Sequence, residues 1–232
     1  MDSLGTVLMI WAHPDDETYL VGGLSAVLTD AGHRVVCVTA TRGEAGVSGA
    51  ADPHRGRLAE IRTAELGEAL GILGIEEHHW LDYPDGGCSD IDAKAAAGRL
   101  ALLLDDVRPD TVVTFGPDGF TGHPDHQAVS LWTDLALTRA SRRPRLLHAV
   151  AREEVVDPEL EEDFGVYELG RPRVCANDDL DLLLELDGVV LDRKVEALLR
   201  QVSQTGGLVQ AVGLQRFRAW VASESFAEPQ IR

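Results

Sequence analysis

Apolar residues along the chain alternate between short runs and longer stretches with helical spacing. Five short segments, most of them continuously apolar, are typical of strands buried on both faces: residues 6–12, 34–40, 77–81, 110–115 and 145–151. Five longer stretches have helical spacing: residues 17–31, 58–73, 92–107, 125–140 and 192–204. The alternation predicts βαβ units and therefore an α/β fold, a Rossmann-like three-layer α/β/α sandwich with a mainly parallel sheet.

The pattern weakens after residue 151. We expect one domain over residues 1–232, with an acidic excursion around 152–180 and a last helix around 192–204. The densely acidic residues 153–163 favour a solvated flap or loop, and residues 221–232 favour a loose tail.

The charge balance narrows the classes of partner. The chain has 21 basic and 39 acidic residues, a formal net charge of −18, which disfavours binding to nucleic acid or to an anionic membrane. No apolar run approaches the ~18 residues of a membrane span, and the N-terminus lacks the basic region of an export signal. The three cysteines lie far apart in the sequence, which favours a reducing, cytoplasmic location over a disulfide framework.

Two polar clusters follow predicted strands. Residues 12–17 (AHPDDE) come directly after the first strand, and residues 122–126 (GHPDH) come in the loop after the fourth. Ligands of open parallel sheets bind beyond the carboxyl ends of the strands, so both clusters should open onto one rim. Pro14 suits the first position of a helix, which would place His13 and Asp16 on one side of a turn and leave Asp15 beside them.

The second cluster repeats this spacing with His123 and His126. Two histidines and one carboxylate form the N/N/O ligand set of a catalytic zinc ion with an open position for water. Zinc acidifies that water and polarises a carbonyl group, and a neighbouring carboxylate can take the proton.

Two other interpretations stay open from the residues alone. His-Pro-Asp is also a good sequence for capping a helix N-terminus. Two such clusters at one sheet edge favour a shared site over two unrelated helix caps. A nucleotide-binding Rossmann site would require G-x-G-x-x-G after the first strand, where this chain has HPDDET.

The paired motifs AHPDDE and HPDH resemble the PIG-L/LmbE family of zinc-dependent N-deacetylases. Lesser similarities include residues 41–44 (TRGE), residues 83–86 (YPDG) and the helix at 194–204. The resemblance implies that His13, Asp16 and His126 hold zinc, with ferrous iron as the alternative metal. It also implies that Asp15 is the general base, that His123 stabilises the oxyanion and can protonate the departing amine, and that Asp125 orients an imidazole.

The resemblance further implies sugar contacts for Glu44, Arg62 and Asp85, each of which has a simpler alternative. Arg62 could pair with Glu65 on its own helix, Asp85 could be a turn residue, and Glu44 could be an ordinary loop acid. The chain departs from the family at two places. Thr121 stands where a tyrosine is expected, and Gln201 stands where a histidine is expected.

The sequence therefore predicts a metal-dependent hydrolase that removes an acyl group, most simply acetyl, from an amino sugar or glycoconjugate. The expected partner is that small molecule, and assembly into a homo-oligomer stays open. One alternative is an amidase of a thiol-sugar conjugate or a deacylase that tailors an antibiotic. An alternative of another class is a non-catalytic, Rossmann-like module that binds a nucleotide or sugar.

Overall fold

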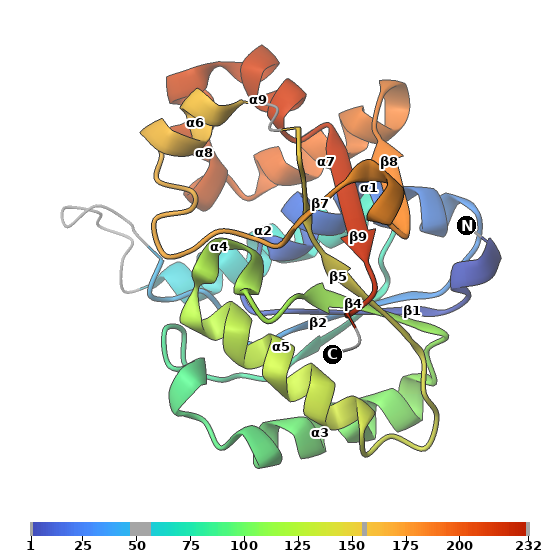
Figure 1. Ribbon diagram of the computed structural model, residues 1–232. Helices are drawn as coiled ribbons and strands as arrows, with labels where there is room; N and C mark the ends of the chain where they lie inside the picture. Colours follow the sequence, from blue (N-terminus) through green and yellow to red (C-terminus); the bar gives the residue numbers. More distant parts are fainter. Residues whose placement is uncertain (1, 47–56, 155–156, 231–232) are drawn as a thin grey trace.

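A seven-stranded sheet with helices on both faces forms the centre of the computed structural model, which describes residues 2–46, 57–154 and 157–230 (Figure 1). The strands lie in the order β3-β2-β1-β4-β5-β9-β8. Their bounds are Val7–Trp11 (β1), Val35–Thr39 (β2), Glu77–Trp80 (β3), Thr111–Phe115 (β4), Arg145–Ala149 (β5), Leu182–Glu185 (β8) and Ser223–Ala227 (β9). The first five strands are parallel, so the predicted fold class is confirmed.

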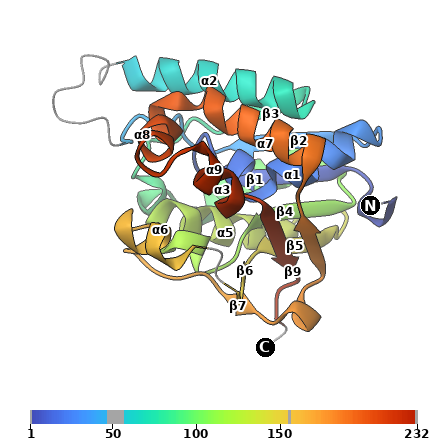
Figure 2. The same ribbon diagram turned by 90° about the horizontal axis from the view of Figure 1, so that it is seen from above.

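The helices cover the sheet in two layers. One face carries α1 (Asp16–Asp30), α2 (Leu58–Leu73) and α7 (Gly188–Arg200), and the other carries α3 (Ala93–Val107) and α5 (Pro124–Leu137) (Figure 2). Every residue of β1, β2 and β4 is buried, which explains the continuous apolar runs of these strands. Val7 of β1 pairs with Val35 on one side and with Thr111 on the other, so the carboxyl ends of β1 and β4 lie next to each other.

The predictions for the last third of the chain need three corrections. Residues 223–227 are not part of a loose tail but form β9, which pairs antiparallel with both β5 and β8. The predicted helix at 192–204 is two helices, α7 and α8 (Val202–Val212), which meet at Gln201 and are followed by α9 (Leu214–Trp220). Part of the predicted flap is α6 (Pro158–Asp163), where Asp157 caps the helix and acids favour its N-terminal end.

Shorter elements connect these parts. They are β6 (Ala151–Arg152) and β7 (Val174–Cys175), which pair with each other, α4 (Gly119–Gly122), and three short 3-10 turns at Asp2–Leu4, Cys88–Asp90 and Asn177–Asp179. Among the described residues, no helix combines the length and the apolar content that crossing a bilayer requires.

Helix α1 is broken at Val21, and a buried carboxylate caps the part that follows. Val21 has a non-helical φ of −139°. Glu224 of β9 accepts hydrogen bonds from the backbone N–H groups of Gly23 and Leu24, at 2.7 and 2.8 Å. The ammonium of Lys194 lies 2.8 Å from the same carboxylate, and both side chains are fully buried. The ion pair therefore connects α1, α7 and β9.

The second part of α1 packs closely against its neighbours, most tightly at Gly23. A Cβ on Gly23 would lie 2.4 Å from the Leu186 side chain, and one on Gly22 would lie 3.1 Å from the Lys194 side chain. The close approach lets Lys194 reach Glu224 beneath the helix.

We predict that Lys194→Met lowers the free energy of unfolding by about 3–5 kcal/mol, because Glu224 would be left as an unpaired buried charge. Urea denaturation measures the change. The matched control is Arg200→Met on the same helix, which removes an exposed pair with Glu196 and should cost no more than about 0.5 kcal/mol. Equal losses in the two variants would contradict the assignment.

Candidate functional site

The two polar clusters meet at the carboxyl ends of β1 and β4, as predicted. The strand order reverses between these two strands, which is the point where open α/β sheets form their binding crevices. Nδ1 of His13 lies 3.1 Å from Nε2 of His126, across 113 positions of sequence. The ring of His126 stacks on Phe115, the last residue of β4, which packs edge-on against Trp11 at the end of β1.

The turn after β1 differs from the predicted helical turn. Helix α1 begins at Asp16, so Pro14 precedes the helix, and Asp15 has a φ of 107°. Asp16 instead closes the turn by accepting a hydrogen bond from the His13 N–H at 2.8 Å. Arg62 supports it from α2 by donating to the Pro14 carbonyl. Pro124 does occupy the first helical position of α5, as predicted.

Hydrogen bonds on the far sides of two imidazoles fix their tautomers. Nδ1 of His126 donates to the Gly119 carbonyl at 2.9 Å, which leaves the Nε2 lone pair facing the site. Nε2 of His13 lies 3.0 Å from Asp85 and 3.2 Å from Asp125, so this nitrogen donates and Nδ1 keeps its lone pair. When His13 is neutral, the two lone pairs face each other, and a shared metal ion stabilises that arrangement. When His13 carries a second proton, its Nδ1–H instead donates to Nε2 of His126.

Asp16 completes a set of three donors. Its carboxylate oxygens lie 3.7 Å from Nδ1 of His13 and 3.5 Å from Nε2 of His126. Ligands about 2.0–2.1 Å from a tetrahedral zinc ion are separated by about 3.3–3.4 Å, and the two imidazole nitrogens are near that spacing. Each nitrogen lies closest to a different oxygen of Asp16, and two nitrogens with a carboxylate are the donor types of catalytic zinc. The residues therefore fit the metal.

His123 is a rival third ligand, because its ring nitrogen also lies within reach of His13 and His126. Its hydrogen bonding argues against that role. Nδ1 of His123 accepts from the backbone N–H of Asp125 at 3.2 Å, so the ring proton of the neutral imidazole is on Nε2. Nε2 is therefore a hydrogen-bond donor, which suits contact with a carbonyl oxygen.

The electrostatics of the cluster favour a positive charge at His13. Burial disfavours its imidazolium form, but hydrogen bonds to Asp125 and Asp85 outweigh burial and raise the pKa of His13 to about 10. Burial lowers the pKa of His126 to about 4, so this ring is neutral. The positive charge on His13 also stabilises the carboxylate of Asp85. Burial alone would raise the pKa of Asp85, but the hydrogen bond to His13 lowers it to about 2.

Asp15 has the electrostatics of a proton acceptor that works near neutrality. Burial raises the pKa of Asp15 to about 7, against the opposing charge of Arg62, and Asp16 and Glu17 raise it further. One carboxylate oxygen lies 3.4 Å from the Arg62 guanidinium. Strongly shifted carboxyl groups beside a cleft are typical of acid–base catalysis.

The three predicted sugar-binding residues lie in the wall of the site. Arg62 is buried and donates to Gly43, Pro14 and Asp15; its predicted alternative partner Glu65 instead accepts from Ser203. The side chain of Asp85 is 6% exposed, and it contacts His13 and the Ala45 N–H. Glu44 accepts from the Asp85 N–H at 3.0 Å. Their contact with a sugar stays a prediction.

Sequence reasoning gave no role to Glu17, although it belongs to the first motif. Glu17 is fully buried, accepts from the Asp15 N–H at 3.0 Å and from the Gln201 side chain at 2.8 Å, and so braces the turn. Gln201, which stands in place of the expected histidine, thus contacts Glu17 from the junction of α7 and α8. Thr121, in place of the expected tyrosine, lies 3.4 Å from Nδ1 of His126. His54 lies outside the described residues.

We predict that Asp125→Asn weakens zinc binding about 10- to 100-fold. Both carboxylate oxygens act as acceptors, from Gly86 and Cys88, and one also faces His13; an amide would place an N–H₂ group at one of these positions. Competition with a chromogenic chelator measures the affinity. Asp134→Asn on the same helix is the control, because among the described residues its side chain accepts no hydrogen bond. Unchanged affinity in Asp125→Asn would disprove the orienting role.

Fold and site together define a Rossmann-like α/β protein with a histidine–aspartate cluster at the switch point of its sheet. The chain belongs to the PIG-L family, described as GlcNAc-PI de-N-acetylase, whose model matches residues 8–137. This confirms the family predicted from the paired motifs.

Two curated relatives and one solved structure illustrate the similarity. The chain is 40% identical over 155 residues to a 1D-myo-inositol 2-acetamido-2-deoxy-alpha-D-glucopyranoside deacetylase of Mycobacterium sp. (strain KMS), which covers 58% of this chain and 50% of the relative. It is 31% identical to the deacetylase of the same name from Corynebacterium glutamicum (strain R), over 97% of this chain and 88% of the relative. The N,N'-diacetylchitobiose deacetylase of Pyrococcus horikoshii has the same fold, with a TM-score of 0.67 at 20% identity over 95% of this chain and 82% of that one. The chain thus spans half the length of the mycobacterial relative.

Proposed function

We propose that this chain is a metal-dependent hydrolase that removes an acetyl group from the nitrogen of an amino sugar. The observation that carries the proposal is the convergence of two imidazole nitrogens and the Asp16 carboxylate beside Asp15. The family description and the names of the curated relatives, which are deacetylases of a 2-acetamido sugar, support the reaction and the class of substrate.

His13, Asp16 and His126 would hold the metal, with zinc as the first choice and ferrous iron as the alternative. Two nitrogen donors and one carboxylate oxygen are the ligand type of catalytic zinc. The chemistry that such an ion supplies when bound is polarisation of the amide carbonyl and acidification of water.

Asp15 and His123 would carry the proton transfers and the hydrogen bonding. Asp15 takes a proton from the attacking water and delivers it to the departing nitrogen, so that the C–N bond breaks, a C–O bond forms, and a carboxylate and an amine leave. Burial lowers the pKa of His123, so the neutral ring donates a hydrogen bond from Nε2 to the carbonyl oxygen as negative charge develops there. Asp125 keeps His13 in the tautomer that the metal requires.

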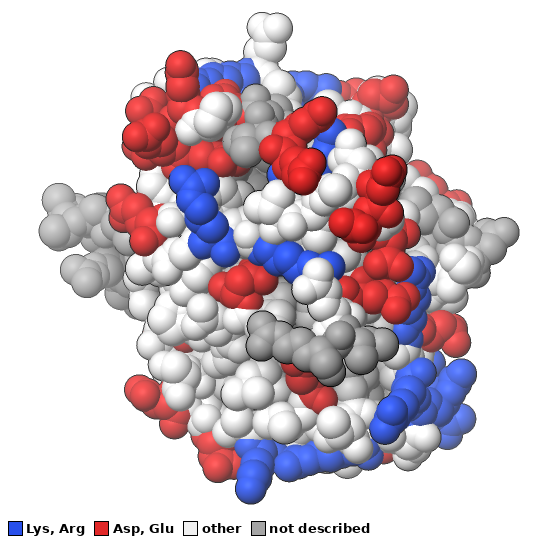
Figure 3. Space-filling model, viewed as in Figure 1, with Lys and Arg blue, Asp and Glu red and all other residues white. Residues whose placement is uncertain are grey.

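The proposal includes the kind of partner and the location. A small N-acetylated sugar or glycoconjugate is the partner, with binding to nucleic acid disfavoured by the charge of −18. On the face shown in Figure 3, basic groups form separate small clusters between acidic ones, without a continuous basic stripe. A cytoplasmic location is consistent with Cys37, Cys88 and Cys175, which are buried and unbonded.

We predict that protein purified without chelator binds about one zinc ion per chain, and that Asp15→Asn keeps the metal but loses about 10²- to 10⁴-fold in kcat/KM. Elemental analysis and release of acetate from N-acetylated sugars measure the two quantities. The matched control is Asp82→Asn, because Asp82 also has a positive φ but is exposed and pairs with Arg42. A chain that binds no divalent metal and hydrolyses no amide would favour the non-catalytic binding module.

We predict that kcat/KM rises with pH and then reaches a plateau. Asp15 must be deprotonated to accept a proton, and burial raises its pKa to about 7, so activity is lost as pH falls through that value. A bound cation would move the break to lower pH. Metal-replete protein assayed from about pH 4 to 9 tests the assignment, and a flat profile over this wider range would rule out Asp15 as the base.

A further inference from the structure

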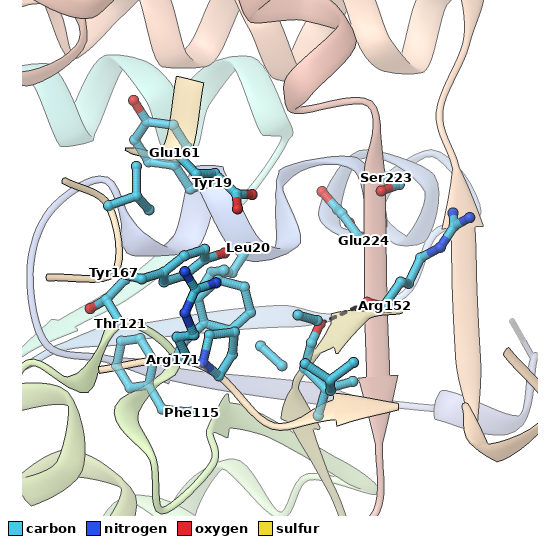
Figure 4. Close-up of a pocket in the computed structure, with 18 of the residues that line it drawn as sticks. Tyr19, Leu20, Phe115, Thr121, Arg152, Glu161, Tyr167, Arg171, Ser223 and Glu224 are labelled. Carbon is cyan, nitrogen blue, oxygen red and sulfur yellow. Dashed lines mark hydrogen bonds between the residues drawn. The ribbon is translucent and has the colours of Figure 1, made fainter. Parts of the chain in front are cut away.

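A cavity of about 340 Å³ opens beside Asp16 and His126, on the side of the site that faces β5 and β9. Its walls come from α1, the segment that follows β6, and the end of α9. Figure 4 shows Phe115, Thr121, Tyr167 and Arg171 at one end and Arg152, Ser223 and Glu224 at the other. The cavity has the volume of roughly ten water molecules at ~30 Å³ each.

The wall nearest to Asp16 and His126 is apolar and aromatic. Its residues are Tyr19 and Leu20 of α1, Phe120 of α4, Val166 and Tyr167 of the segment after α6, and Trp220 of α9. Two of the charged groups are already paired: Glu224 with Lys194, and Arg152 with Glu185 and Glu154. Glu161 of α6 also lines the cavity, and partial burial raises the pKa of its carboxyl group. Arg171 lies at the exposed rim over the Tyr167 ring. Sugar hydroxyls would lose hydrogen bonds in such a space, whereas hydrocarbon would gain burial.

The polar residues of the candidate site lie on the side away from the cavity. Arg62 comes from α2, and Glu44 and Asp85 come from the loops after β2 and β3; none of the three lines the cavity. The strand order places β2 and β3 on the opposite side of β1 from β4, β5 and β9. A substrate centred on the candidate ligands therefore meets polar groups on one side and the apolar cavity on the other.

We propose that this cavity binds the acyl chain of the substrate, and that the enzyme therefore hydrolyses longer N-acyl groups of amino sugars in addition to acetyl, and does so faster. This inference rests on the proposed function. The acyl group is bonded directly to the carbonyl carbon under attack, so it is the apolar part of the substrate that lies nearest to Asp16 and His126. An acetyl methyl would leave most of the cavity filled with water.

The test compares N-acetyl-, N-butanoyl- and N-hexanoylglucosamine with the zinc-loaded protein. Burial of each added methylene should raise kcat/KM by up to about fourfold. Val166→Trp, which narrows the cavity, should flatten the dependence of kcat/KM on the length of the acyl chain. Val189→Trp is the matched control, because Val189 lies on α7 and is 72% exposed.

A second series keeps the acetyl group and lengthens the aglycone, with methyl, butyl and hexyl glycosides of N-acetylglucosamine. If kcat/KM does not change with the length of the aglycone but rises with the length of the acyl chain, the cavity is an acyl site. A steeper rise in the glycoside series, or N-acetylglucosamine as the best substrate of the first series, would overturn the proposal.

Calorimetric binding separates this inference from the proposed function. The affinities of N-acetyl- and N-hexanoylglucosamine for the zinc-loaded protein are measured in parallel with hydrolysis. Absence of hydrolysis alone counts against the proposed function. Tighter binding of the hexanoyl compound that is lost in Val166→Trp supports the acyl site, and equal affinities, or no binding of either compound, contradict it.

Discussion

The structure depends on one electrostatic constraint: two imidazole nitrogens face each other 3.1 Å apart, so a proton or a metal ion must lie between their lone pairs. The Gly119 carbonyl holds one ring in that orientation, and the carboxylates of Asp85 and Asp125 hold the other. Facing lone pairs repel each other unless a positive charge lies near them, and three carboxylates surround the pair. The strand order makes the arrangement possible, because β1 and β4 are neighbours whose loops leave the sheet at its switch point.

A second set of buried polar groups holds the turn that carries Asp15 and Asp16. Arg62 bonds the turn and the Gly43 carbonyl from α2, and Glu17 connects it to Gln201. Asp15 needs this support because its positive φ is costly for a residue other than glycine. The positions of the candidate base and of the candidate ligand Asp16 are therefore set by residues from α2 and from the junction of α7 and α8.

Much of the fold and the centre of the site could be predicted from the sequence, because both follow from local signals. Buried parallel strands are continuously apolar, and clusters after two such strands must meet at one sheet edge. The place of β9 could not be predicted, since its Ser-Glu-Ser sequence becomes strand only through pairing with β5 and β8 and through burial of Glu224 against Lys194. The contact of Asp85 with His13 was equally hidden, because a Pro-Asp-Gly-Gly turn does not indicate what its carboxylate touches.

The capping of α1 by Glu224 has a consequence for the order in which the protein assembles during translation. The segment matched by the family model ends at residue 137, yet the helix that begins at Asp16 is held by a strand near the other end of the chain. A nascent chain from which both motifs have emerged still lacks the hydrogen bonds of Glu224 to α1. We therefore expect the site to reach its final geometry only after β9 has left the ribosome.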